Sequence, residues 1–241
     1  MNHSPRSSKI ESAMMTIASL ALAGMASIAY SQEGSAARER AAAEASRTVE
    51  PEWPIVDEHW LPLRFESATA LDSARFHYRR NEEVAAANEI RKAISWIRLA
   101  ADHALPITKE KLRAAETDLS ALAKDVEAGN LSDAARLDAS LARASQALAE
   151  YHFFEAKETF GSHQAAYAAQ NLEAAVTHLE HAANSAHHQY GPETIGVFNE
   201  VLKHSNEATQ KRLIDNEVLS KQMDGVEKAM KELADALRKA G

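Results

Sequence analysis

The chain contains no cysteine, only eight glycines and six prolines among 241 residues, and aromatic side chains make up 6% of it. Without cysteine the protein has no disulfide, no thiol nucleophile and no lipid attachment through a bacterial lipobox. Few glycines, few prolines and few alternating apolar runs argue against a β-sandwich or a β-barrel. The hydrophobic fraction still reaches 45%, largely through alanine, which favours closely packed helices. We therefore predict an all-α fold, an antiparallel bundle of four to five long Ala-rich helices.

The first 31 residues have the pattern of a secretory signal peptide. Arg6 and Lys9 precede an apolar stretch over residues 13–29, and small residues around Ala29 suit cleavage by signal peptidase. The apolar stretch is short for a membrane anchor and polar residues follow it at once, although an uncleaved anchor is the alternative. We expect residues 1–31 to be removed, leaving a periplasmic or secreted protein with no stable membrane span.

Charge narrows the class of partner. The chain carries a net charge of −8, and its leader contributes one positive charge, so the remainder carries −9. Nucleic-acid phosphates need a face of clustered lysine and arginine, but the pair Arg79-Arg80 is followed at once by Glu82-Glu83. We therefore expect no nucleic-acid partner, and predict binding to another envelope protein or self-association.

An N-terminal linker and arm, residues 32–64, precede the predicted helical domain, residues 65–241. Within the arm, residues 51–63 hold three of the six prolines together with Trp53 and Trp60. Proline at this density is incompatible with a regular helix or a central strand. We predict a strap that packs along the helices, with a lip for a ligand or partner as the alternative.

Apolar residues recur at spacings of three and four through the helical domain. This period predicts helices over residues 66–104, 108–128, 132–161, 162–188 and 193–239. We assign the N-caps of the second and third helices to Thr108 and Ser132, and expect breaks at Gly161 and at Pro192. The last helix ends in a coiled-coil-like ladder over residues 219–237, either a contact surface for a partner or a face packed on the first helix.

Two stretches of the domain resemble each other. Residues 88–104 match residues 170–186 at an offset of 82, and Phe76-His77-Tyr78 resembles Tyr151-His152-Phe153 at an offset of 75. The difference of seven preserves helix phase, so a duplicated hairpin explains both matches, and chance alignment of alanines is the alternative. An exported, Ala-rich, duplicated helical chain resembles the YfdX-type stress proteins of enterobacteria. The resemblance is one of architecture, so it suggests a stress-related role and carries over no site residue.

Histidine is the one reactive residue type present in excess. His178, His181 and His188 lie at positions i, i+3 and i+10 of a predicted helix, on one stripe. Imidazoles one turn apart bind Zn²⁺, Ni²⁺ or Cu²⁺, so these residues are candidate metal ligands. They flank the apolar ladder instead of lying in it, so a solvated polar face and a proton-sensing role are the alternatives.

His77 and His152 are each bracketed by aromatic residues. They form a candidate pair lining a pocket between two hairpins, where noncovalent haem is one conceivable ligand, or two residues at the edge of the core. Covalent haem is excluded because the chain has no CxxCH motif. A ferritin-like di-iron centre is excluded because no glutamate stands three residues before a histidine.

Motifs for enzymatic catalysis are missing from the sequence: it has no GxSxG, HExxH or Gly-rich phosphate loop. The sequence therefore favours a non-enzymatic helical bundle that acts by protein–protein interaction or self-association and needs no cofactor. A His-dependent bundle that binds a transition metal or haem is the alternative. Ten histidines outside the leader would move the net charge from −9 to about +1 near pH ~5, so we expect self-association to change between pH 7 and pH 5.

Overall fold

A computed structural model describes the fold of residues 60–131, 133–209 and 215–240. The predicted signal peptide, residues 1–31, and the linker and arm up to residue 59 lie outside the described residues. Within the described ranges all regular secondary structure is α-helical, which confirms the all-α prediction.

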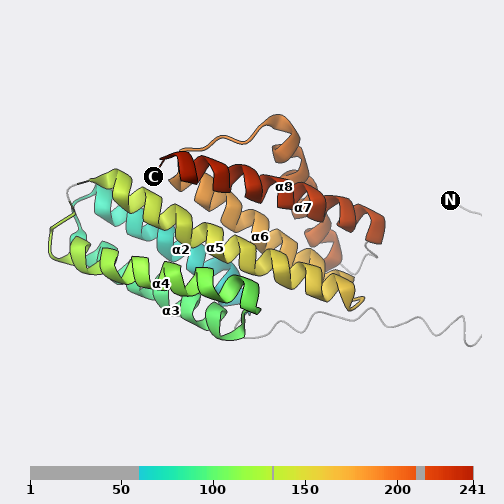
Figure 1. Cartoon of the computed structure of the whole chain (residues 1–241), viewed down its shortest axis with the longest axis horizontal. Helices are drawn as coiled ribbons and strands as arrows, with labels where there is room; N and C mark the ends of the chain where they lie inside the picture. The colour runs from blue at the N-terminus through green and yellow to red at the C-terminus, as the bar shows by residue number, and fades with distance from the viewer. Residues whose placement is uncertain (1–59, 132, 210–214, 241) are drawn as a thin grey trace, which may run out of the picture. The chain divides into compact units, whose positions relative to one another are not determined.

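The described residues form seven helices, where the periodicity led us to expect four or five (Figure 1). In chain order they are α2 (Trp60–Arg79), α3 (Glu83–His103), α4 (Pro106–Glu127), α5 (Ala134–Gly161), α6 (Ala165–Ser185), α7 (Pro192–Thr209) and α8 (Asn216–Ala240).

The predicted single helix over residues 66–104 is wrong, because the chain turns at Asn81 and forms α2 and α3. Asn81 has a φ of 57°, and asparagine tolerates this left-handed conformation better than most residues. Its N–H and that of Glu82 satisfy carbonyls of the last turn of α2. The expected irregular arm also ends earlier than residue 63, since α2 begins at Trp60 with a proline in its first turn, where no N–H is needed.

Proline and glycine mark other boundaries, and the predicted breaks at Gly161 and Pro192 are confirmed. α4 begins at Pro106, α5 ends at Gly161, α7 begins at Pro192, and Gly129 adopts a φ of 64° just after α4. The two predicted N-caps differ from the structure. Leu105 precedes α4, with Thr108 donating back to its carbonyl. The Asp133 carboxylate accepts from the N–H of Ala135 at the start of α5, and Ser132 lies outside the described residues.

The predicted continuous helix over residues 193–239 is also wrong. α7 and α8 pack against each other in opposite directions, with Lys228 Nζ 3.0 Å from the Glu193 carboxylate at one end of the pair. The polar stretch KHSNEATQKRLIDNE, residues 203–217, covers the end of α7 and the start of α8. Residues 210–214 within it lie outside the described residues. A chain reversal lets both apolar faces reach one core.

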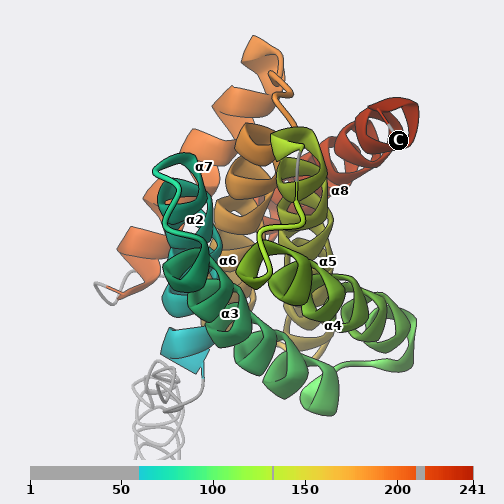
Figure 2. The ribbon, with the colours of Figure 1, turned by 90° about the vertical axis from the view of Figure 1, so that its left-hand side faces the viewer.

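Two hydrophobic clusters form the interior, and α5 contributes to both. The first is built by α2, α3, α4 and the N-terminal part of α5, and the second by the C-terminal part of α5 with α6, α7 and α8. Figures 1 and 2 show α5 running between α4 and α6. The ladder of α8 lies in the second cluster, against α5, α6 and α7, so most of it is already buried.

The α2–α3 and α5–α6 hairpins have matching local geometry. α3 and α6 each span 21 residues, with bounds that differ by 82 at both ends. All eight buried residues of α3 fall on buried residues of α6 at this offset. The turns agree as well: Asn81 and His163, 82 apart, have φ angles of 57° and 61°. This register pairs His77 with Thr159, so it does not extend to the match at an offset of 75.

The crossing of α7 and α8 depends on Gly225. A Cβ atom at this position would lie 2.8 Å from Cγ1 of Val197 and 2.9 Å from its Cγ2. We expect Gly225→Ala to lower the free energy of unfolding by about 1–3 kcal/mol, because overpacking outweighs the gain in helix propensity. Gly196→Ala, at a helical glycine with open space around it, should raise it by about 0.5–1 kcal/mol. Urea unfolding measures both changes in the free energy of unfolding. Equal changes for the two variants would contradict the close packing of Gly225 against Val197.

Candidate functional site

Polar side chains are buried where α2, α5 and α6 meet, between the two hydrophobic clusters. We call this group the polar seam, and every member is at most 7% exposed. Its members are Ser67 and Arg75 on α2, Asp138 and His152 on α5, and His178 and Ser185 on α6.

The seam follows from heptad spacing on two neighbouring helices. Asp138 and His152 stand fourteen residues apart on α5, and His178 and Ser185 stand seven apart on α6. Residues at this spacing share one helix face. Buried alanines lie between the polar residues along both faces, together with the buried Ser145 on α5, so the two helices approach closely around the polar groups.

Two histidines lie face to face inside the seam. The rings of His152 and His178 are stacked, with centroids 5.4 Å apart and planes inclined by 6°, and both residues are fully buried. Nε2 of His178 lies 3.4 Å from the hydroxyl of Ser67, and Tyr151 meets the His152 ring edge-on. The expectation that His178 faces water is therefore wrong. α6 packs against α2, α5, α7 and α8, which leaves little of its surface to solvent.

At the other end of the seam, a buried ion pair joins α2 to α5. Nε of Arg75 lies 3.0 Å from the Asp138 carboxylate, and an Nη of Arg75 donates to the hydroxyl of Ser185. The Asp138 carboxylate also lies 3.7 Å from Nη2 of Arg79 and 3.3 Å from Nε2 of His187. One carboxylate thus ties together α2, α5 and the C-terminal end of α6.

The structure does not bring the candidate metal ligands together. His178 is in the seam, Nδ1 of His181 lies 2.8 Å from the Asp72 carboxylate, and Nε2 of His188 lies 3.2 Å from that of Glu232. Across the part of the chain that the structure describes, no three His, Asp or Glu side chains converge as a metal site would require.

His77 and His152, the candidate pocket pair, also lie in different environments. Nδ1 of His77 is 2.6 Å from the Glu82 carboxylate at the α2–α3 turn, whereas His152 stacks on His178. Hydrogen bonds from His77 and then Arg80 hold the pKa of Glu82 below its usual value.

The seam reaches the surface beside three exposed residues at the end of α2. We call Phe76, Arg79 and Arg80 the α2 patch. Phe76 is 58% exposed, and the Arg80 guanidinium lies 5.3 Å from the centre of its ring. A shallow pocket of about 330 Å³ opens here, lined by Asp72, Arg75, Phe76, Arg79, Arg80 and Asn184. Sequence reasoning noted the arginine pair but missed Phe76 as a surface residue, although it falls off the apolar stripe formed by Leu71 and Ala74.

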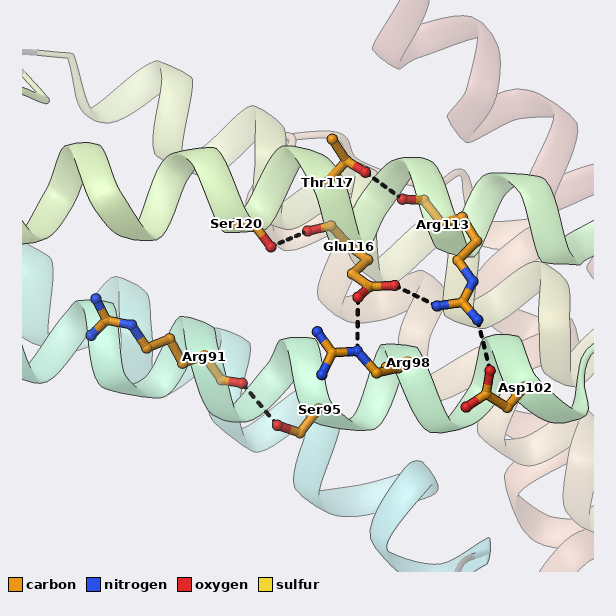
Figure 3. Close-up of polar contacts among 8 residues, drawn as sticks. All are labelled: Arg91, Ser95, Arg98, Asp102, Arg113, Glu116, Thr117 and Ser120. Atoms are coloured by element: carbon orange, nitrogen blue, oxygen red, sulfur yellow. Dashed lines mark hydrogen bonds and ion pairs between the residues drawn. The ribbon is translucent and has the colours of Figure 1, made fainter.

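Ion pairs hold α4 in place on both sides. Figure 3 shows the Glu116 carboxylate between Arg98 and Arg113. Nε of Arg98 lies 2.8 Å from it and Nη1 of Arg113 lies 2.9 Å from it, while Nη2 of Arg113 contacts Asp102. Burial disfavours ionisation of Glu116, but these two arginines outweigh it and keep its pKa below the usual value. Towards α5, three pairs recur at heptad spacing, Lys111–Glu150, Asp118–Arg143 and Asp125–Arg136. Three shallow grooves lie beside α4, and most of the charged side chains that line them are neutralised by these partners.

Glu155, on α5, has an unusual protonation equilibrium. Burial, with a smaller contribution from Glu158, raises its pKa from 4.5 to about 7. The folded state therefore binds the proton more tightly than the unfolded state, and stability falls as pH rises from about 4.5 through 7. We expect Glu155→Gln to raise the free energy of unfolding by ~1 kcal/mol at pH 8, a value reduced for solvent screening, and to change it little at pH 4.

Thermal unfolding of Glu155→Gln at both pH values measures this effect. Glu200→Gln, at an exposed position on α7, is the matched control. A gain for Glu155→Gln that is the same at pH 4 and pH 8 would contradict the raised pKa.

Comparison of the chain with protein-family models, curated proteins and solved structures finds no match. The resemblance to YfdX-type proteins stays a prediction based on architecture. None of the helices in the described ranges has the length and apolar character needed to cross a membrane.

Proposed function

We propose that the protein is an exported, non-enzymatic helical bundle that acts by binding another protein through the α2 patch. The observation that carries this proposal is the exposure of Phe76 beside the Arg80 guanidinium, at the lining of a shallow pocket. Aromatic residues and arginine are enriched at protein interfaces, where they supply most of the binding energy. The Arg75–Asp138 pair anchors the same stretch of α2, so the patch is held in place before a partner arrives.

We infer further that the α2–α3 and α5–α6 hairpins arose by duplication of an ancestral hairpin. Three matches at an offset of 82 support this inference: the bounds of α3 and α6, the buried positions of α3 that recur in α6, and the φ angles of the two turns. At this offset Glu158, Gly161 and Ser162 stand where Phe76, Arg79 and Arg80 form the patch. Because the second turn has neither the aromatic residue nor the arginines, the patch is a property of the first hairpin and not of the repeat.

Site-specific cross-linking tests the proposal. A photo-reactive amino acid at position 76 should give a discrete cross-linked product in the periplasm, whereas one at Ile107, an equally exposed apolar position on α4, should not. Arg79→Glu combined with Arg80→Glu should remove the product, and its mass distinguishes a different protein from a second copy of the chain. Equal products at the two positions, or none at position 76, would contradict the proposal.

A His-dependent metal or haem site is the weaker candidate, since His178, His181 and His188 each contact a different polar partner. Metal analysis by mass spectrometry and an absorption spectrum of untagged protein separate the two functions. We expect metal well below one equivalent and no Soret band. Stoichiometric metal that is lost in His178→Ala/His181→Ala would favour the alternative.

A further inference from the structure

Three carboxylates surround the α2 patch, and each of them contacts a histidine. Asp72 meets His181 at 2.8 Å, Glu82 meets His77 at 2.6 Å, and Asp138 meets His187 at 3.3 Å. The histidine side chains are 27%, 30% and 71% exposed, respectively, so protons from solvent reach all three.

Two of these carboxylates, Glu82 and Asp138, also neutralise the arginines. The Glu82 carboxylate lies 2.9 Å from the Arg80 guanidinium. The Asp138 carboxylate lies 3.0 Å from that of Arg75 and 3.7 Å from that of Arg79. Asp72, Glu83 and Glu180, which interacts with His181, also lie nearby, so with neutral histidines three arginines stand against five carboxylates and the local charge is −2. The groups come from every element around the patch: α2 itself, the turn into α3, α5, and the C-terminal end of α6, with Glu83 following in the first turn of α3.

Protonation of the histidines changes this balance. Histidine is the side chain whose charge ordinarily changes between pH 5 and pH 8. Three imidazolium ions would bring the local charge from −2 to +1. Those of His77 and His187 would compete with Arg80 and Arg79 for the carboxylates of Glu82 and Asp138. The arginines are then available to carboxylates of another molecule, while the exposed ring of Phe76 offers an apolar contact beside them.

We propose that the α2 patch binds an acidic segment of a partner protein, and that protonation of His77, His181 and His187 tightens this binding. The proposal rests on the proposed function and adds the chemistry of the partner and its regulation. Charge complementarity supports the choice of partner, because an acidic segment keeps its charge at pH 5.5 while the patch becomes positive. A periplasmic protein would meet such a change in pH directly when the medium acidifies.

Fluorescence anisotropy with the full chain tests the proposal, using a labelled hexa-aspartate peptide at low salt. Affinity should rise about tenfold between pH 7.5 and pH 5.5, as three unit charges appear near the site. A hexa-asparagine peptide should not bind. Arg79→Gln/Arg80→Gln should lose the hexa-aspartate peptide at both pH values.

A pair of histidine variants separates the patch from the change in overall charge. His77→Gln/His187→Gln should keep the affinity at pH 7.5 and lose most of the rise at pH 5.5. His103→Gln/His163→Gln removes two exposed histidines at the end of α3 and in the α5–α6 turn, and should leave the rise unchanged. Circular dichroism at both pH values establishes that each variant is folded, and His181→Gln replaces the first pair if it does not fold.

The outcomes distinguish this proposal from the proposed function. Peptide binding that does not change with pH, or a rise that both histidine pairs reduce equally, would overturn the regulation by histidine. Failure of hexa-aspartate to bind at either pH would overturn the acidic partner. Each of these results leaves the cross-linking at position 76 intact, and loss of that cross-link is what would overturn the proposed function itself.

Discussion

Asp138→Ala should lower the free energy of unfolding by about 3–5 kcal/mol, a large share of the 5–15 kcal/mol typical of a domain. The substitution leaves the Arg75 guanidinium buried without its counter-ion, since both side chains are only 9% exposed. It also removes the contacts that Asp138 makes with Arg79 and His187. Guanidinium chloride unfolding followed by circular dichroism measures the loss.

Asp118→Ala is the matched control for this prediction. Asp118 also pairs with an arginine, Arg143, but both side chains are at least 40% exposed, and such pairs contribute about 0–1 kcal/mol. The double variant Arg75→Met/Asp138→Leu should recover most of the stability, because it leaves no buried charge. If Asp138→Ala costs no more than Asp118→Ala, the pair is not buried in solution and the patch lacks the anchor that we assign to it.

The helix boundaries that sequence reasoning predicted are those set by local chemistry. A helix ends at Gly161 and another begins at Pro192 because the backbone itself is freed or restricted there, whatever the surroundings. The turn at Asn81 has no proline or glycine, and it depends on α2 and α3 each having an apolar face to bury against the other. This turn depends on packing between helices, so the apolar spacing of three and four continues through it with no local sign that a helix ends.

Sequence reasoning did not predict the polar seam, for a related reason. His178 lies beside the apolar stripe of its helix, which in a helix at the surface means contact with water. α6 is surrounded by four other helices, and the partner of His178 is His152, on a different helix and 26 residues away in the chain. A single sequence reports the residue types of one helix face but not how many neighbours that helix has. The α2 patch was missed because the charges of Arg79 and Arg80 cancel those of Glu82 and Glu83 in sequence, which conceals the exposed Phe76 beside them.

Phe153→Ala should lower the free energy of unfolding by about 3–5 kcal/mol, because Phe153 is among the largest fully buried side chains of the second cluster. Its ring lies on α5, next to the seam residue His152, and Nζ of Lys157 is 5.3 Å from the ring centre. Truncation leaves a cavity at the point where α5 passes from the first cluster to the second, so we expect both halves of the bundle to lose stability together.

Substitutions of two other phenylalanines are the controls for the Phe153→Ala prediction. Phe154→Ala, at the neighbouring and partly buried position, should cost ~1–2 kcal/mol, and Phe76→Ala, in the α2 patch, should stay within about 0.5 kcal/mol of the parent protein. Phe76→Ala should nevertheless weaken binding of the hexa-aspartate peptide, whereas a folded Phe154→Ala should bind it normally. A large loss of stability in Phe76→Ala would mean that its ring supports the fold. The exposed aromatic residue would then no longer be an argument for a binding surface.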